Sequence, residues 1–467
     1  MAELDKLPTG IRGLDHALNG GVARGRATLL TGGPGCGKTL LALSSAVHTV
    51  VAGGHKALFV AFEEARDDLL ASARAIGLPI DEALDSGLIL NGAAATDAIV
   101  GEVGEYSLEA LTLRLGHQIE QHGIELVALD TLEALFSMFS KRDVVRKALV
   151  ELLSALKSRD VAVVITAEED GPLLGSVGLE QYVADCVVLL DQQVVASVVT
   201  RRLRIRKYRG SAHATGEMPF LIDSEGVHVM PVESAMLDHQ PLSELQETGA
   251  ELLDEALGGG LRRGSTALIS GATGVGKTQL AARIAVENCA AGRKSLIVSF
   301  EESPAELLLN LGELGERLSQ ACNDDRCHVF AARPTQFGLE RHLVAIYRLL
   351  DEFQPDLIVV DPISSLEASG PDHQVHRMLV RLMDGAKRRN VTGLYTTQMS
   401  HLDRRNPDVP LSSIIDHWLH IARRKKGRRP PFALTVIKAR GLDHWHDPVG
   451  MQLDAAGPGF RRLDDER

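Results

Sequence analysis

Two short segments, 32–39 and 271–278, carry the spacing of glycines, lysine and threonine that binds the phosphates of a nucleoside triphosphate. The glycines let successive backbone N–H groups turn toward one anion at a helix N-terminus, the lysine reaches the outer phosphates, and the threonine hydroxyl can hold a magnesium ion. The sequence therefore predicts two nucleotide sites that use Mg²⁺. The loop residues expected to contact nucleotide are Gly33, Gly35, Cys36, Gly37, Lys38, Thr39, Leu40, Thr273, Gly274, Val275, Gly276, Lys277, Thr278 and Gln279.

An aspartate ends an apolar segment downstream of each loop, Asp130 in the first half and Asp361 in the second. Because an open parallel sheet presents the carboxyl ends of its strands to the ligand, these carboxylates can hold the hydration shell of Mg²⁺ beside Thr39 and Thr278. A strand-ending aspartate is otherwise a cap or a turn residue. The loops upstream favour the magnesium interpretation, which makes these four residues the predicted metal site.

Paired glutamates follow another apolar segment in each half, Glu63 with Glu64 and Glu301 with Glu302. A carboxylate there can orient or deprotonate the attacking water or hydroxyl in phosphoryl transfer. The alternative is a solvated strand end. Because the pair recurs at the same offset from its loop in both halves, we predict a catalytic role for at least the first member of each pair.

Two cation pairs, Lys207 with Arg209 and Lys438 with Arg440, lie late in the two halves. Their spacing of two points both side chains of a pair to the same side of a strand. Fixed cations of this kind neutralise charge on a transferring phosphoryl group, and in ring assemblies they serve the neighbouring subunit's nucleotide. The alternative is an exposed basic edge strand. His213, shortly after the first pair, is a further candidate for nucleotide contact, although a lone histidine is usually only packed or exposed.

The two halves are copies of one pattern. Lys277 follows Lys38 at about 239 positions, and Asp361 follows Asp130 at about 231, which is too long for a solenoid repeat and suits tandem domains. We expect a first domain at 1–232, a linker at 233–247 and a second domain at 248–467.

Short runs rich in Val, Ile, Leu and Ala alternate with amphipathic stretches, as in helices that cover a mostly parallel sheet. A helix is expected at 143–158, and the last two strands of the first half are expected to add an antiparallel hairpin at the sheet edge. The fold class is therefore α/β, with two such sheets in tandem. The strands expected in the first half are 27–31, 56–62, 126–130, 162–167, 186–191, 198–208 and 218–222.

The composition is that of an ordinary globular enzyme: 467 residues, 45% hydrophobic, with a net charge of -12. With no long apolar stretch and no signal-like start, we expect a cytoplasmic protein that does not enter a membrane. The five scattered cysteines suggest reduced thiols. Cys322 and Cys327 are the nearest approach to a metal pair, but they lack a second pair, so a polar loop is the favoured interpretation.

Over nearly the whole chain the sequence resembles the KaiC family, the double RecA-like ATPases and autokinases of the cyanobacterial clock. The resemblance implies two RecA-like domains in a homohexamer of two stacked rings, with ATP at the subunit interfaces. It also implies hydrolysis in the first ring and self-phosphorylation in the second. The motifs that carry it, beyond the loops, are Phe62-Glu63-Glu64, Asp130-Thr131, 207–213, 216–220, 438–441 and His446-Asp447.

Ser412 and Ser413 occupy the place of the family's Ser-Thr phosphoacceptor pair, while Gln181 and Tyr182 stand there in the first half. Adjacent serines are otherwise common in loops and helix caps. The resemblance thus implies serine autophosphorylation in the second domain. The chain ends at Arg467, where the clock protein continues into a tail used by a stimulating partner, so we expect no dependence on such a partner. Other signalling partners stay open.

Two other classes compete with this interpretation. A RecA-type, DNA-stimulated ATPase would need basic or aromatic pore loops, yet 168–171 is acidic and aromatic residues are 4% of the chain. The basic run 423–429 is the one segment that looks like a polyanion site, and a solvated turn or a subunit interface is the favoured explanation for it. Nucleic acid is therefore an unfavoured partner. The other class is a nucleotide-gated scaffold.

Overall fold

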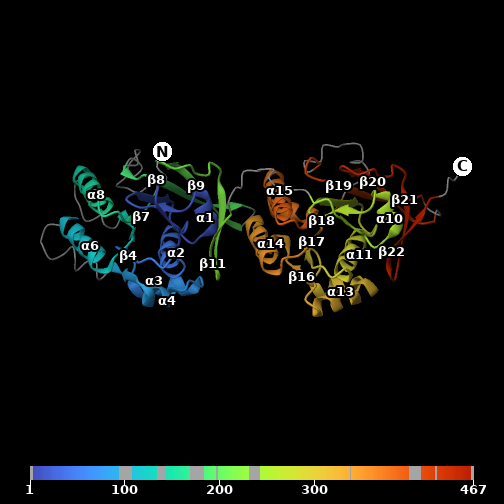
Figure 1. Ribbon diagram of the computed structural model, residues 1–467, viewed down its shortest axis with the longest axis horizontal. Helices are drawn as coiled ribbons and strands as arrows, with labels where there is room; N and C mark the ends of the chain where they lie inside the picture. The colour runs from blue at the N-terminus through green and yellow to red at the C-terminus, as the bar shows by residue number, and fades with distance from the viewer. Residues whose placement is uncertain are drawn as a thin grey trace. The chain divides into compact units, whose positions relative to one another are not determined.

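The computed structural model describes residues 4–93, 108–133, 142–168, 183–195, 198–230, 242–336, 338–398, 412–425 and 429–463. The chain divides into two compact units, Met1–Ser234 and Ala235–Arg467. In Figure 1 the first unit runs from blue to green and the second from yellow-green to red. Each unit is described by itself.

The first unit is built on a nine-stranded sheet in the order β11-β10-β9-β8-β3-β7-β6-β4-β5. The strands from β8 to β5 are parallel, whereas β9, β10 and β11 continue the sheet antiparallel. The strands of the sheet are β3 (Ala27–Gly32), β4 (Ala57–Ala61), β5 (Leu88–Asn91), β6 (Leu126–Asp130), β7 (Ala162–Glu168), β8 (Cys186–Val195), β9 (Val198–Tyr208), β10 (Met218–Asp223) and β11 (Gly226–Val229).

Apolar side chains cover both faces of this sheet, and β4 shows how. Its odd-numbered residues, such as Phe59, join the buried cluster that includes α2, α3 and α4, while Leu58 and Val60 join the cluster that includes α6 and α8. The alternation follows from the period of two along a strand, and it explains why the parallel strands are apolar throughout. The helices are α1 (Arg12–Ala17), α2 (Lys38–Val51), α3 (Arg66–Ala75), α4 (Ile80–Ser86), α6 (Leu108–His122) and α8 (Arg142–Lys157).

The second unit repeats this sheet in the order β16-β15-β17-β18-β14-β19-β20-β21-β22, with β20 to β22 antiparallel. Its sheet strands are β14 (Thr266–Gly271), β15 (Ser295–Ser299), β16 (Cys327–Ala331), β17 (Leu357–Asp361), β18 (Thr392–Gln398), β19 (His417–Arg423), β20 (Phe432–Ala439), β21 (Val449–Asp454) and β22 (Gly457–Arg462). Its helices are α10 (Glu251–Ala256), α11 (Lys277–Ala290), α12 (Pro304–Asn310), α13 (Glu313–Asn323), η2 (Pro334–Gln336), α14 (Leu339–Phe353), η3 (Ile363–Ser369) and α15 (Asp372–Arg388).

The expected α/β class, the parallel sheets and the antiparallel edge are confirmed. Strands at 126–130 and 198–208 have the predicted bounds, and the helix expected at 143–158 is α8. The short strands β5 and β11 were not predicted, nor were the two-stranded ribbons that precede each loop. These ribbons pair β1 (Lys6–Leu7) with β2 (Val22–Ala23) and β12 (Leu245–Gln246) with β13 (Leu261–Arg262).

Two further points concern the ends of the units and the helices. Leu245 and Gln246, which fall in the expected linker, pair within the second unit as β12, while 231–241 lie outside the described residues. Among the described residues, no helix is both long and apolar enough to span a bilayer.

Candidate active sites

Each phosphate loop connects the central strand of its sheet to the first long helix, β3 to α2 and β14 to α11. The loop lysines turn back on the loop: Lys38 Nζ donates to the carbonyls of Gly32 and Gly33 at 2.9 and 3.0 Å, and Lys277 Nζ donates to Gly271 and Ala272 at 3.0 and 2.9 Å. Burial lowers the pKa of Lys277, while the nearby Asp361 and Glu301 carboxylates oppose that shift. The two lysines are thus held in the same place in both units.

The glycines of the loops explain where a phosphate fits. A Cβ built on Gly33, Gly35 or Gly274 meets no atom within 4 Å, so the backbone there borders open space large enough to admit a ligand. A Cβ on Gly37 or Gly276 would instead collide with Ile222 at 2.5 Å or Leu453 at 2.6 Å. These two glycines have φ of 102° and 92° and begin α2 and α11. The positive φ is the reason that the loop favours glycine here, because the nearby Ile222 and Leu453 atoms are the ends of flexible side chains.

The predicted loop residues differ in what their side chains can do. Cys36 and Val275 are 1% exposed and belong to the apolar cores, and burial raises the pKa of the Cys36 thiol. Their contribution to a nucleotide is limited to the backbone. Thr273 and Gln279 line a cavity in the second unit, together with the lysine and threonine of that loop.

The strand-end aspartates contact the loop threonines. Thr39 Oγ1 donates to Asp130 at 3.1 Å, and Thr278 Oγ1 donates to Asp361 at 2.8 Å. Both carboxyls are buried, and this burial raises the pKa of each; hydrogen bonds from Thr166 and Thr39, and from Thr396 and Thr278, oppose that shift. The predicted metal residues thus meet in pairs, and their oxygen ligands are of the kind Mg²⁺ prefers.

Thr166 and Thr396 are site residues that the sequence analysis missed. Thr166 Oγ1 donates to Asp130 at 2.5 Å, and Thr396 Oγ1 donates to Asp361. Both threonines are fully buried, at corresponding places in β7 and β18. The signal that would have found them is the repeat itself, because a threonine recurs in the two strands at nearly the offset of the aspartates.

The glutamate pairs stand beside these aspartates. Glu63 accepts a hydrogen bond from Thr131 Oγ1 at 3.5 Å, and Glu301 accepts one from Ser365 Oγ at 2.8 Å. Glu302 accepts from Asn310 Nδ2 at 2.9 Å. In the second unit both glutamates face the same cavity of about 320 Å³ as Lys277 and Asp361, with Asn310, Gln398 and Leu453 also in its wall.

The cation pairs lie at the other end of the sheet from their own loops. Lys438 pairs across from Trp418, which is level with Leu268 near the start of β14, whereas the loop leaves β14 after Gly271. Lys207 pairs across from Val187, which is level with Leu29. Each lysine is therefore about 10 Å back along the strand direction and two strands, again about 10 Å, to the side of its own loop. His213 lies in the turn after β9, on the same side, and its Nδ1 contacts the Ala214 carbonyl at 2.9 Å.

In the second unit the cations hold the segment that contains the candidate phosphoacceptors. Lys438 Nζ donates to the carbonyls of Ser412 and Ile415 at 2.9 and 2.7 Å, and Arg440 donates to the Ser413 carbonyl at 3.0 Å. Burial lowers the pKa of Lys438, as does the neighbouring Arg440. Ser413 is exposed and Ser412 is half-buried.

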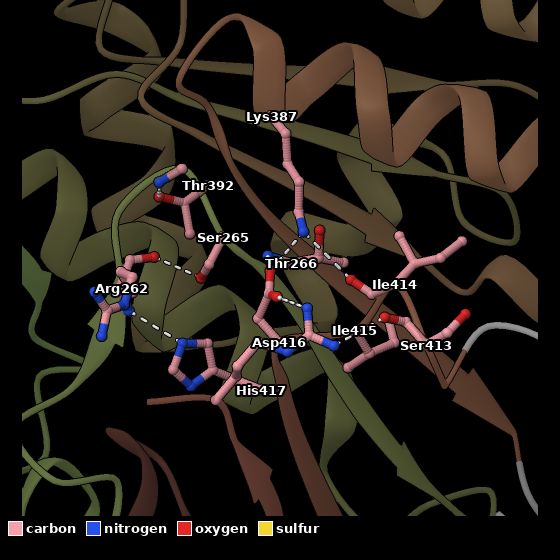
Figure 2. A network of polar contacts seen from close by, with 12 residues as sticks. Arg262, Ser265, Thr266, Lys387, Thr392, Ser413, Ile414, Ile415, Asp416 and His417 are labelled. Atoms are coloured by element: carbon pink, nitrogen blue, oxygen red, sulfur yellow. Dashed lines mark hydrogen bonds and ion pairs between the residues drawn. The ribbon is translucent and has the colours of Figure 1, made fainter. Parts of the chain in front are cut away.

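Asp416 connects this segment to the core (Figure 2). Its carboxylate contacts Lys387 Nζ at 2.6 Å and Arg440 at 3.3 Å and accepts from the Thr266 N–H at 3.0 Å. Lys387 also donates to the Ile414 carbonyl at 3.3 Å. Although burial opposes the shift, these partners hold the pKa of Asp416 below its usual range. The Ser412–Asp416 turn is therefore fixed by charges from β20 and α15.

Several residues named from the sequence lie outside the described part of the chain: 169–171, Gln181 and Tyr182, 426–428 in the basic run, and the last four residues. The interpretation of Cys322 and Cys327 as part of a polar loop was wrong. Cys322 lies in α13 and Cys327 begins β16, where it is 4% exposed.

The repeated loop, the threonine–aspartate contact and the parallel sheet with an antiparallel edge define a protein of two tandem RecA-like P-loop ATPase domains. The family model described as "ATPase: KaiC" matches residues 7–234 and again 246–457. The chain belongs to this KaiC ATPase family.

Curated relatives agree along nearly the full chain. The "Circadian clock protein KaiC2" of Synechocystis sp. is 38% identical over 447 residues, which is 94% of this chain and 78% of the relative. The "Circadian clock oscillator protein KaiC" of Picosynechococcus sp. is 31% identical and covers 95% of this chain and 87% of its own length. The protein of the same name from Synechococcus elongatus is 30% identical, with 95% and 86% covered.

Proposed function

We propose that this KaiC-family ATPase is a Mg-ATP-dependent ring enzyme that hydrolyses ATP and phosphorylates its own serine residues in the second domain. The observation that carries the proposal is the position of the cation pairs, at the opposite end of the sheet from their own phosphate loops. A site whose anion-stabilising cations lie about 10 Å behind and two strands to the side of their own loop is completed by another copy of the chain. A homohexamer with nucleotide at the interfaces meets this need.

The proposed chemistry assigns each residue a task. Lys38 and Lys277 bind the outer phosphates, and the exposed glutamates Glu63 and Glu301 orient and deprotonate the attacking group. When bound, Mg²⁺ neutralises phosphate charge; Thr39 with Asp130, and Thr278 with Asp361, would hold it. The open space beside Gly33, Gly35 and Gly274 is consistent with phosphates that lie against the loop backbone.

The second domain differs from the first in having a serine acceptor. Ser412 and Ser413 stand on the turn that Lys438 and Arg440 hold by its carbonyls. We propose that these two cations carry the turn with them to the neighbouring subunit's nucleotide. One of the two hydroxyls then attacks the γ-phosphate, with Glu301 of that neighbour receiving its proton. In the first domain water is the attacking group.

A labelling experiment tests this assignment. Full-length protein incubated with γ-labelled ATP is mapped by mass spectrometry, and label on Ser412 or Ser413 is the expected result. Released phosphate without phosphoprotein would reduce the function to an ATPase, and stimulation of that release by single-stranded DNA would favour a RecA-type motor. If neither phosphoprotein nor released phosphate forms, the result would favour a nucleotide-gated scaffold.

The glutamate assignment has its own variant. Glu301→Gln removes the proposed base and should lower phosphoprotein formation about 100-fold or more while the hexamer still forms. Glu63→Gln is the matched control in the first domain, where phosphate release should fall instead. Phosphorylation of Glu301→Gln at the wild-type rate would contradict the assignment.

We further propose a cytoplasmic location and signalling partners, in line with five free thiols and the clock names of the relatives.

A further inference from the structure

A serine hydroxyl outside the phosphate loop holds the proposed base of the second unit. Ser365 Oγ donates a hydrogen bond to Glu301 Oε1 at 2.8 Å. Glu301 lies in the wall of the cavity that Lys277 and Asp361 also line, whereas Ser365 comes from η3, four positions after that aspartate. The bond fixes the carboxylate by one oxygen and leaves Oε2 as the oxygen that can receive a proton.

The segment that bears this hydroxyl is anchored in the unit. Ile363 and Leu366, which flank the serine in η3, are 4% and 0% exposed. Ser364 Oγ accepts a hydrogen bond from the Gln398 N–H at 3.3 Å, which ties the same turn to the end of β18. A hydroxyl on a segment that is already fixed loses little further freedom when it donates, so it can hold a long side chain in place.

The backbone on both sides of the glutamate is fixed as well. The Phe300 N–H donates to the Asp361 carbonyl at 2.9 Å, and the Glu302 N–H donates to Ser299 Oγ at 3.1 Å. The freedom that remains to Glu301 is therefore in its side-chain torsions. The serine hydroxyl restricts these torsions, because it holds the carboxylate at the far end of the side chain.

The first unit holds its corresponding glutamate more weakly. Thr131 Oγ1 donates to Glu63 Oε2 at 3.5 Å, well beyond the length of about 3.0 Å at which ordinary O–H···O bonds end. At the offset that separates the two strand-end aspartates, Ser365 corresponds to Ala134, which has no hydroxyl. Water, the proposed attacking group of the first unit, can reorient to meet its base, whereas a serine of a neighbouring copy is constrained by its chain. A fixed carboxylate is therefore of most use where the acceptor is a side chain.

We propose that Ser365 is a positioning residue for γ-phosphate transfer in the second domain, where it holds Glu301 in the orientation that receives the proton of the attacking hydroxyl. This role rests on the proposed function, in which Glu301 is the base. The Oγ of Ser412 or Ser413 from a neighbouring copy bonds to the γ-phosphorus, while the bond from that phosphorus to the β,γ-bridging oxygen breaks and ADP leaves. The hydroxyl proton passes to Glu301 Oε2. Ser365 keeps its own proton and acts only through the carboxylate.

Transfer rates in a Glu63→Gln parent test this role, because the first-domain base is then absent and the products come from the second domain. Full-length protein is incubated with γ-labelled ATP at several concentrations, and labelled phosphoprotein and released phosphate are added together. Ser365→Ala should lower the maximal rate about tenfold and keep the half-saturating ATP concentration within about twofold, since a misplaced base slows transfer without loosening ATP. Ser365→Thr, which keeps the hydroxyl donor, should restore the rate to within about threefold.

A double variant separates positioning from an independent effect. Glu301→Gln combined with Ser365→Ala should stay within about twofold of Glu301→Gln alone, because a residue that acts through the carboxylate then has nothing left to position. Ser369→Ala is the matched control. It removes another η3 hydroxyl, which donates to the Pro334 carbonyl at 2.8 Å, and it should leave the rate unchanged.

Three results would each overturn the positioning role: the parent's maximal rate in Ser365→Ala, a further loss of about tenfold in the double variant, or an equal loss in Ser369→Ala. If Glu301→Gln keeps the parent's rate, the base assignment falls as well. A slow Glu301→Gln with a fast Ser365→Ala removes only the role of Ser365. Whether the label goes to serine or to water is measured separately and tests the proposed function alone.

Discussion

The two units hold their phosphate loops in the same way but differ just beyond them. In the first unit the Glu133 carboxylate accepts a hydrogen bond from the Glu168 N–H at 2.7 Å. In the second unit the Ser364 hydroxyl accepts the corresponding hydrogen bond from the Gln398 N–H at 3.3 Å. One unit thus has two carboxylates where the other has two neutral groups. The hydrogen bond to the backbone N–H is thus present in both units, whereas the charge of the side chains around it differs.

A second difference concerns the aspartates that precede β8 and β19, Asp185 in the first unit and Asp416 in the second. Asp185 contacts Lys157 at 2.6 Å and Arg26 at 3.1 Å. Asp416 contacts Lys387 at 2.6 Å and Arg440 at 3.3 Å. Arg26 comes from beside the central strand, where the second unit has Ser265, whereas Arg440 belongs to the proposed catalytic pair. In the second unit Asp416 and the Ser413 carbonyl therefore hold Arg440, the cation that we propose serves a neighbouring copy, against the turn that contains Ser412 and Ser413.

The largest effect is expected when the two phosphate loops are disabled one at a time, which tests whether the two units have different roles. Lys277→Ala should lower phosphoprotein formation about 100-fold or more, because the second site loses its main phosphate contact, while first-unit phosphate release continues. Lys38→Ala should lower phosphate release and hexamer assembly. Phosphoprotein and native mass are measured for both. An unchanged turnover and mass for Lys38→Ala would contradict the role of the first unit.

The aspartate networks give the next largest effect. Asp416→Asn leaves the Lys387 ammonium, whose side chain is 10% exposed, without its countercharge, and should cost about 3–5 kcal/mol in unfolding free energy. Asp185→Asn should cost less, because the Lys157 side chain is 24% exposed. Urea unfolding at neutral pH measures both.

The pH dependence of the wild type follows from the same ion pairs. The pKa values of Asp185 and Asp416 are lowered in the folded state, so their stabilisation is present above the ordinary aspartate pKa of 3.8 and is lost as the pH falls below it. Equal losses for the two asparagine variants would show that burial of the lysine does not set the cost.

The smallest expected effect concerns Glu133. Burial raises its pKa from 4.5 to about 7, although the hydrogen bond from the Glu168 N–H opposes this shift. The folded first unit therefore binds an extra proton between these values and loses stability as the pH rises from 4.5 to 7. Glu133→Ser, which copies the second unit, should remove a loss of about 1–2 kcal/mol across this window, a figure reduced because the side chain is only partly buried.

Urea unfolding at pH 5 and pH 8 measures this difference, and Ser364→Ala is the uncharged control in the second unit. If Glu133→Ser and the wild type show the same change between the two pH values, Glu133 is not the titrating group.

Much of this architecture could be predicted from the sequence, because it depends on local patterns. Apolar runs predicted β6 and β9 to the residue, and loop spacing predicted the contacts of Thr39 with Asp130 and of Thr278 with Asp361. What was missed depends on side chains that meet from distant elements. Thr166 looks like an ordinary strand residue until β7 pairs with β6, the strand that ends at Asp130.

The other misses have the same physical origin. The Lys438 contact with the Ser412 carbonyl requires the turn that brings two residues far apart in the sequence together. Glu133 reads as one more surface carboxylate in the sequence, because burial is a property of the packed helix and loop around it.

The contact of Leu453 with Gly276 has a mechanical consequence. Leu453 lies on β21, and β21 is hydrogen-bonded to β20. Lys438 lies at the end of β20, and Arg440 follows directly after the strand. A displacement of the start of α11 by the size of one methyl group would meet the Leu453 side chain, because a Cβ built on Gly276 would lie 2.6 Å from its Cδ2. In the ring that we propose, the antiparallel edge would therefore connect the nucleotide pocket of one copy to the cations that this copy offers to the next.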